Sequence, residues 1–140
     1  MKTLNNLYPG ELEFTLCFNY DSLPFLDLRI FRNSEGFFNT DLFVKPTFKN
    51  LYLNYNSYHS KHFLENIAYG QALRIRTICS TKESAHKNLN TLKSNLIERG
   101  YPTSIVNEKV SKTCTIPRRT LLNRNRTKCA RNFNAPPPPR

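Results

Sequence analysis

Three aspartates, Asp21, Asp27 and Asp41, are the residues in this chain whose type could support metal-dependent chemistry. Two-metal catalysis needs acidic ligands gathered around one pocket. Asp27 and Asp41 could be neighbours on adjacent strands, but Arg29 would share the face of Asp27. That placement favours an ion pair on a sheet surface over a metal site. We therefore expect no catalytic metal site.

Histidines and cysteines are the other residues that could serve as metal ligands. His59 and His62 are spaced i, i+3, but no further ligand stands at a suggestive distance along the chain. Phosphate contacts and helix capping fit this pair better. The four cysteines show no CxxC pair, whereas structural zinc normally needs closely spaced ligands. We expect no cofactor, no catalytic centre and free buried thiols at Cys17, Cys79, Cys114 and Cys129.

Positive charge is confined to the last two-thirds of the chain. Residues 1–43 hold three Lys/Arg against six Asp/Glu, a net charge of −3. Residues 44–140 hold eighteen against four, a net charge of +14. Such a basic module usually faces a polyanion, because each neutralised phosphate releases condensed counterions. A solvated basic surface or a basic tail is the alternative; the charge pattern favours nucleic acid.

The first part of the chain has the pattern of a small sheet. Apolar and polar residues alternate over 12–18, 25–32 and 37–44, and turn-forming residues stand at 19–22 and 33–36. Short connections between strands predict an antiparallel meander. Three strands with one apolar face need another layer to pack against.

The apolar period then changes from 2 to 3.6, which predicts helices. A stripe of apolar residues runs over 63–78. Ser80 and Glu83 form a capping-box pattern for a second helix, which Gly100 would end. Pro102 suits the first turn of a third, short helix. We expect the three helices to pack together and to cover the sheet.

The predicted fold class is α+β: a three-stranded antiparallel β-meander, then a three-helix bundle of helix-turn-helix type, then a disordered tail. The predicted segments are the meander at 1–47, the helical domain at 48–115 and a basic, Pro-rich tail at 116–140. The sequence has no long apolar run and no signal-peptide pattern, so we expect an intracellular, nuclear protein.

Short motifs occur in a fixed order over residues 4–122. They are Phe25-Leu26-Asp27; Lys45-Pro46-Thr47; Tyr52-Leu53 with Ser57-Tyr58-His59; Gln71-Ala72-Leu73-Arg74 with Arg76 and Cys79; Leu96 with Arg99-Gly100-Tyr101-Pro102; and Arg118 to Leu122. In this order they resemble the region after the catalytic palm in reverse transcriptases of Penelope-like retroelements. The helical part also resembles the helix-turn-helix domain of such elements, which corresponds to the polymerase thumb.

The resemblance implies a thumb or helix-turn-helix fragment that binds template–primer phosphates without sequence specificity. Its partners would be RNA, DNA or their hybrid, and the palm of a parent polymerase. The palm aspartates and a GIY-YIG endonuclease do not occur in this sequence, so we do not expect the chain to be an enzyme. A helical protein-interaction module with the Pro-rich segment as ligand, or a translated relic without function, remain alternatives.

Eight residues are the predicted nucleic-acid contacts. Arg74 and Arg76 lie about 200° apart around a helix and cannot face one groove. An ion pair with Glu65 or Glu98 is the alternative for Arg74. The predicted set is Lys45, His59, Lys61, Gln71, Arg74, Arg76, Arg118 and Arg119.

Two further groups of residues have an open interpretation. Tyr52 and Tyr55 could stack on unpaired bases, but packing of their loop onto the sheet is the favoured role. Lys82, Lys87 and Lys93 are expected to form a solvated helix face.

Overall fold

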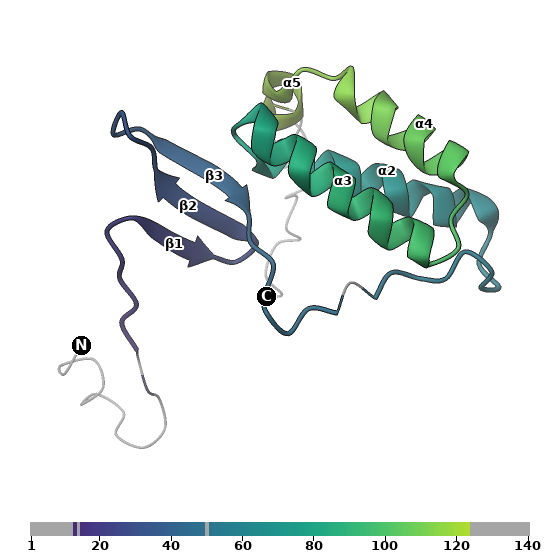
Figure 1. Cartoon of the computed structure of the whole chain (residues 1–140), viewed down its shortest axis with the longest axis horizontal. Helices are drawn as coiled ribbons and strands as arrows, with labels where there is room; N and C mark the ends of the chain where they lie inside the picture. Colours follow the sequence, from purple (N-terminus) through teal and green to yellow (C-terminus); the bar gives the residue numbers. More distant parts are fainter. Residues whose placement is uncertain (1–12, 14, 50, 124–140) are drawn as a thin grey trace, which may run out of the picture.

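The computed structural model of the chain describes residues 13, 15–49 and 51–123. A three-stranded antiparallel sheet comes first and is followed by helices (Figure 1). The predicted α+β fold class is thus confirmed. None of the described helices is long and apolar enough to cross a membrane.

The sheet is a meander of β1 (Ser22–Phe25), β2 (Leu28–Arg32) and β3 (Phe38–Leu42), in that order. The strand predicted at 12–18 is wrong over the described residues 15–18, which belong to no strand; residues 12 and 14 lie outside the described part. Instead, the alternating segment 25–32 is split by a hairpin loop, so that Phe25 pairs with Leu28.

A leucine in the left-handed backbone region explains why that loop was missed. Leu26 has φ = 55°, between the two paired strands. Two-residue hairpin loops need positive φ, and Asn or Gly normally supplies it. The loop between β2 and β3 uses the expected residues: Asn33 Oδ1 accepts from the Phe37 amide at 2.8 Å, and Gly36 has φ = 88°.

Helix α2 (Lys61–Ile78) and helix α3 (Lys82–Glu98) are the two long helices. Ser60 caps α2 by accepting from the Phe63 amide at 3.4 Å. The N-cap of α3 is Thr81 and not the predicted Ser80: the Thr81 hydroxyl accepts from the Ser84 amide at 3.3 Å. The Ser80 hydroxyl is occupied by β3 and is therefore not available for capping.

Helix α4 (Thr103–Cys114) follows α3 after a tight turn. Gly100 has φ = 82° and donates to Ile97 at 2.9 Å, and the Tyr101 amide donates to Leu96 at 3.1 Å. This pair of bonds is the Schellman motif. The predicted end of α3 at Gly100 is confirmed, and Pro102 stands at the N-cap position just before α4.

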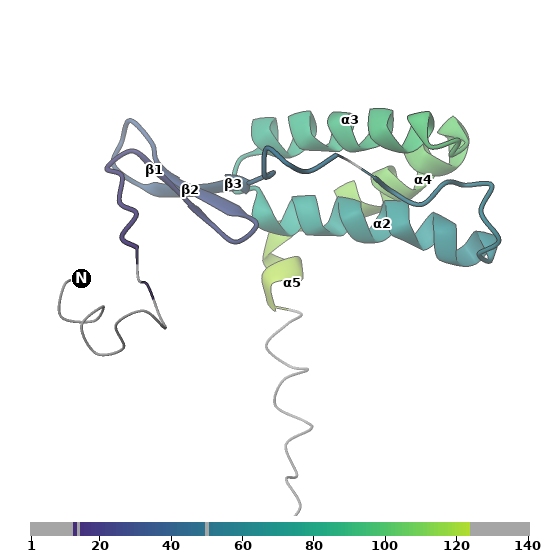
Figure 2. The ribbon, with the colours of Figure 1, turned by 90° about the horizontal axis from the view of Figure 1, so that it is seen from below.

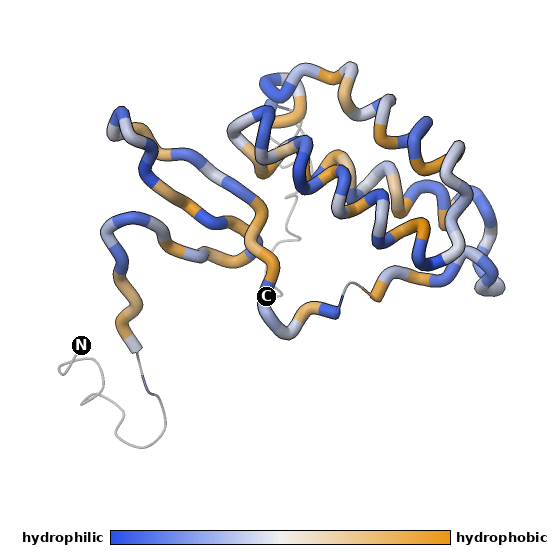
Figure 3. Tube along the Cα trace, viewed as in Figure 1, coloured by the Kyte–Doolittle hydropathy of each residue, from blue (hydrophilic) through white to orange (hydrophobic). Residues whose placement is uncertain are grey.

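The core lies between the helices, whose apolar stripes face one another (Figure 3). The residues that α3 buries there are Ala85, Leu89, Leu92 and Leu96. Phe63, predicted in the α2 stripe, is half exposed. The core residues are Leu64, Ala68, Ala72, Ile75, Cys79, Ala85, Leu89, Leu92, Leu96, Tyr101, Val106 and Val110.

The sheet extends from one end of the bundle and is not covered by it (Figures 1 and 2). The prediction that the helices cover the sheet is therefore wrong. No residue of the three strands is buried, and Phe25 and Phe38 are 57% and 78% exposed. Of the described strands, β3 makes the main contacts with the helices, at the end of α2 and the start of α3.

A short helix, α5 (Arg118–Asn123), lies within the segment for which a flexible tail is predicted. It packs beside α2 with Leu121 buried. The Pro-rich end of the sequence and Cys129 lie outside the described residues. The part of the basic segment nearest to α4 is therefore a structured element of the fold.

Candidate nucleic-acid interface

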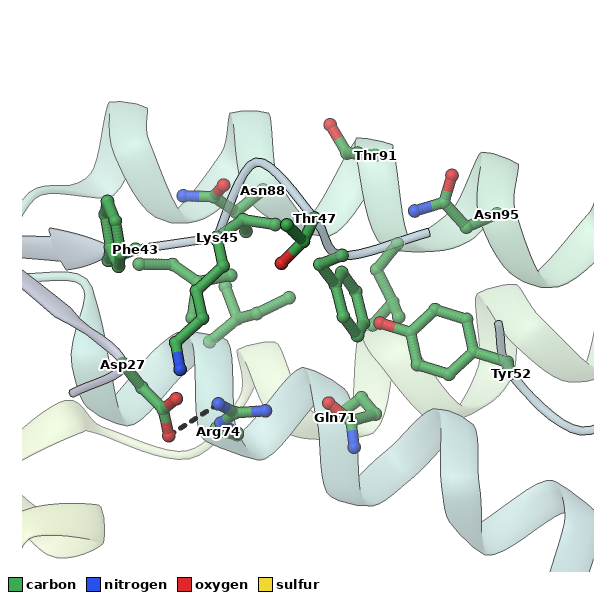
Figure 4. A pocket seen from close by; sticks show the side chains of 15 residues that line it. Asp27, Phe43, Lys45, Thr47, Tyr52, Gln71, Arg74, Asn88, Thr91 and Asn95 are labelled. Carbon is green, nitrogen blue, oxygen red and sulfur yellow. Dashed lines mark ion pairs between the residues drawn. The ribbon is translucent and has the colours of Figure 1, made fainter. Parts of the chain in front are cut away.

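The loop formed by residues 43–49 and 51–52 passes along α2 and α3 (Figure 2), and a pocket of about 430 Å³ lies beside it (Figure 4). The loop leaves β3 at Leu42, and Pro46 prevents it from continuing as a strand. It brings three of the eight predicted contact residues into one place. These are Lys45 from the loop and Gln71 and Arg74 from α2.

The cationic side of the pocket is formed by Arg74 and Lys45. Arg74 Nη2 lies 2.6 Å from the carboxylate of Asp27, which stands in the β1–β2 loop. Neither acid considered from the sequence takes this role; Glu65 pairs with Lys109 at 3.0 Å. In Figure 4, Lys45 extends toward the side where Asp27 and Arg74 meet. The three charges sum to +1, so this side favours an anion.

The opposite side of the pocket is polar and comes from α3. Asn88, Thr91 and Asn95 follow one another along that helix and line the cavity (Figure 4). The Asn88 amide donates to Asp41 at 2.8 Å and to the Ser84 carbonyl at 3.0 Å. Asn95 makes no side-chain hydrogen bond within the described part of the chain. Its amide is thus free to recognise a ligand.

Two aromatic side chains, Phe48 and Tyr52, close the loop side of the pocket. Burial raises the pKa of Tyr52, and the charge of Arg74 lowers it by less, so the net shift is upward. The hydroxyl therefore stays protonated at neutral pH. Tyr55 packs on Tyr101, with ring centroids 5.0 Å apart, and belongs to the structural part of the loop.

Asp41 positions the sheet beside this pocket. Its Oδ1 accepts from the Asn88 amide, the Leu42 amide and the Ser84 hydroxyl, and its Oδ2 lies 2.8 Å from Arg29. Burial raises the pKa of Asp41, but the hydrogen bonds together outweigh it and hold the pKa below 3.8. The predicted sheet-surface ion pair exists, with Asp41 as the partner of Arg29.

Arg76 and Arg118 form hydrogen bonds between the C-terminal end of α2 and the segment that follows α4. Arg76 donates to the Ile116 carbonyl at 2.8 Å, and Arg118 donates to the Thr77 carbonyl at 3.1 Å. The last carbonyls of a helix have no partner within it, so they attract such donors. These two arginines therefore fasten α5 to α2, whereas Arg119 is exposed.

The remaining predicted residues lie at the start of α2. Lys61 donates to the Tyr55 carbonyl at 2.8 Å and its ammonium lies 4.1 Å from the Tyr55 ring centroid. His59 is exposed and stacks on Phe63, with centroids 5.7 Å apart. The structure thus separates the eight predicted residues into three places and brings only three of them to the pocket.

Two further lysines, Lys49 and Lys87, stand next to pocket-lining residues along the chain. Lys49 follows Phe48 in the loop, and Lys87 precedes Asn88 on α3, where it lines a separate hollow with Lys82, Glu83 and His86. Neither forms an ion pair with the described residues, and the same holds for Lys45. Lys87 is predicted to belong to a solvated helix face, and Lys49 is not among the predicted contacts. That Lys49 follows a residue of the pocket could not be recognised without the path of the loop.

The possible metal ligands are dispersed. Within residues 13, 15–49 and 51–123, no group of three or more His, Cys, Asp or Glu could hold a metal ion. Cys79 is buried and free as predicted, and its thiol lies 3.5 Å from Asp41 Oδ1. Cys17 and Cys114 are free but exposed, so the prediction of burial is wrong for these two.

Comparison with known families bears on the helical part. Residues 51–111, which span the end of the loop, α2, α3 and most of α4, match the family model described as the animal helix-turn-helix domain. No curated protein and no solved structure matches the chain. The helical region is thus similar to a helix-turn-helix domain, as the sequence motifs predict.

Proposed function

We propose that the chain is a nucleic-acid-binding module that holds a duplex by its phosphates, through the rim of the pocket. As rim cations we count Lys45 and Arg74, which line the pocket, and Lys49 and Lys87, which are the sequence neighbours of the lining residues Phe48 and Asn88. One observation carries this proposal: within residues 13, 15–49 and 51–123, Lys45, Lys49 and Lys87 form no ion pair, whereas Lys109 and Lys112 on α4 pair with Glu65 and Glu108. Unpaired ammonium groups are the ones that gain most from meeting phosphates.

The match of the helices to a helix-turn-helix domain supports this proposal, because such domains are associated with nucleic-acid binding. Phosphate contacts position a protein on a duplex without reading its sequence. The module would therefore bind many sequences with similar affinity. It would carry out no chemistry itself.

More specifically, we propose that the chain derives from the thumb of a Penelope-like reverse transcriptase and contacts template–primer. The residues on which that resemblance rests support the idea, because they come from separate motifs and meet around one pocket. Asp27, Lys45, Tyr52, Gln71 and Arg74 all line it. Arg76 and Arg118 are then binding residues only indirectly, since they maintain the end of α2.

Fluorescence anisotropy with an RNA–DNA hybrid duplex tests the proposal. The double variant Lys45→Ala/Lys87→Ala removes two rim cations. The negative slope of log K against log salt should become shallower by about two units. The matched control is Arg32→Ala/Lys112→Ala, which removes the same charge from residues that already hold an acceptor. The control should leave the slope nearly unchanged.

Equal slopes for the two double variants would show that binding follows net charge alone and would contradict the rim as the interface. A difference of ten-fold or more between unrelated duplex sequences would contradict phosphate-only contact. Absence of binding by the folded chain at low salt would refute nucleic-acid binding altogether.

A further inference from the structure

The pocket combines chemical features that a phosphate-binding surface alone does not need. Its floor is apolar, formed by Leu42, Ile75 and Leu92, and Phe48 and Tyr52 stand on the loop side. Its volume of about 430 Å³ lies within the range of small-ligand sites. An inorganic anion would leave this aromatic and apolar surface unused.

Side-chain amides face the same cavity from both helices. Gln71 on α2 and Asn95 on α3 each offer donors and an acceptor, and neither is engaged by a side-chain hydrogen bond within the described residues. An apolar peptide side chain in the cavity would leave these amides without partners, which costs free energy. A flat, polar-edged ring would satisfy both the amides and the aromatic walls.

The cationic side of the cavity defines where an attached anion would lie. Arg74 uses one side of its guanidinium for Asp27 and retains further N–H donors. Lys45 approaches the same side without an acidic partner among the described residues. A ligand with a flat ring at one end and a phosphate at the other would place its ring beside the aromatic side chains and its phosphate beside the two cations.

We propose that the pocket holds one unpaired nucleotide of a bound strand, with its base between Phe48, Tyr52 and the two amides and its phosphate at Lys45 and Arg74. This inference rests on the proposed function, since it requires a strand on the rim. A paired base stays stacked inside its duplex and cannot enter a pocket without being flipped out. Single-stranded ends and overhangs are therefore the fitting ligands. Because each amide both donates and accepts, discrimination among the bases is small.

Anisotropy with two hybrid duplexes tests the pocket. One carries a two-nucleotide overhang, and the other carries an overhang of the same length with abasic sites. Both duplexes therefore have the same number of phosphates. We expect the full chain to prefer the duplex with bases by about ten-fold, the scale of one stacked base. Asn95→Phe, which fills the cavity without changing charge, should reduce that preference to near unity.

The matched control is Asn90→Phe on the same helix. Asn90 is exposed and does not line the pocket, so the preference should remain about ten-fold. If both duplexes bind wild type equally, the pocket proposal is overturned while the proposed function stands. If neither duplex binds, both fail. A preference that Asn95→Phe leaves intact also overturns the pocket proposal.

A second measurement remains informative if Asn95→Phe does not fold. An overhang containing 2-aminopurine should lose fluorescence when its base stacks on the loop aromatics. Phe48→Ala changes a half-exposed side chain and should restore at least half of that fluorescence at saturating protein. Equal quenching by wild type and Phe48→Ala, or no quenching by bound wild type, would overturn the proposed stacking.

Discussion

The bundle and the sheet of this molecule are stabilised in different ways. The helices bury a continuous apolar core, in which Leu64, Leu96 and Val106 have no exposed surface. The sheet buries no residue and is joined to the helices through polar contacts of β3, through Leu42, which packs against the core, and through the ion pair of Asp27 with Arg74. The comparison shows that the helical part carries the stability, while the sheet mainly places Asp27 and the loop beside α2 and α3.

The largest expected effect is a deletion in the bundle core. Leu96→Ala removes a fully buried side chain and leaves a cavity, so unfolding should become easier by about 2–5 kcal/mol. Phe38→Ala on the sheet removes a larger side chain that is 78% exposed, and its effect should stay within about 0.5 kcal/mol. Urea unfolding followed by circular dichroism measures both. Similar losses of unfolding free energy in the two variants would mean that the sheet also has a packed core.

A smaller and more local effect is expected at the joint between sheet and helices, where β3 is hydrogen-bonded to Ser80, Ser84 and Asn88. Asp41→Ala removes the acceptor for Ser84 and Asn88 and the partner of Arg29, so we expect a loss of about 1–3 kcal/mol. Amide exchange should quicken at Ser80, whose amide donates to the Thr40 carbonyl at 2.9 Å, and at Thr40, whose amide donates to the Ser80 hydroxyl at 3.0 Å. Amides in the middle of α3 should keep their protection, and their parallel loss would contradict a separable sheet.

Acid should weaken the same joint. The folded pKa of Asp41 lies below its ordinary value of 3.8, so ionised Asp41 stabilises the fold above that value. The contribution is lost as pH falls through 3.8 toward the lower folded pKa. The difference in unfolding free energy between wild type and Asp41→Ala should therefore shrink between pH 6 and pH 2. A difference that stays constant over this range would contradict the role of the carboxylate charge.

The smallest expected change is at α5. Arg118→Ala removes one hydrogen bond to the Thr77 carbonyl, a loss of about 1 kcal/mol. Exchange should quicken in Arg118–Asn123 while the core of α3 stays protected. Arg119→Ala is the matched control, because Arg119 is exposed on the same helix. If both variants behave alike, α5 is not fastened by Arg118.

Local patterns in the sequence predicted the helices well. The apolar period over α3 and Gly100 at its end depend only on neighbours along the chain, and both were correct. The hairpin at Leu26 was missed, because a leucine at positive φ has no local signal. The missing cover over the sheet was also unpredictable, since apolar alternation does not specify what packs against a strand.

The candidate site was predictable only in part for a related reason. Lys45, Gln71 and Arg74 could be named from type and position, and the structure brings them together. Arg76 and Arg118 look equally basic in the sequence, but distant backbone carbonyls take their donors. Which cation remains open to a phosphate depends on tertiary contacts that residue spacing does not encode.

NMR mapping of the duplex-binding surface tests the central claim most directly, because it reports the bundle and the sheet in one experiment. The ¹⁵N-labelled chain is titrated with the blunt hybrid duplex at low salt. We predict that amide shifts concentrate in the loop 43–49, around Arg74 and along the Lys87 side of α3, while Ser22–Phe25 and the 33–37 loop stay unchanged. Shifts centred on the sheet, or no saturable shifts from the folded chain, would contradict this claim.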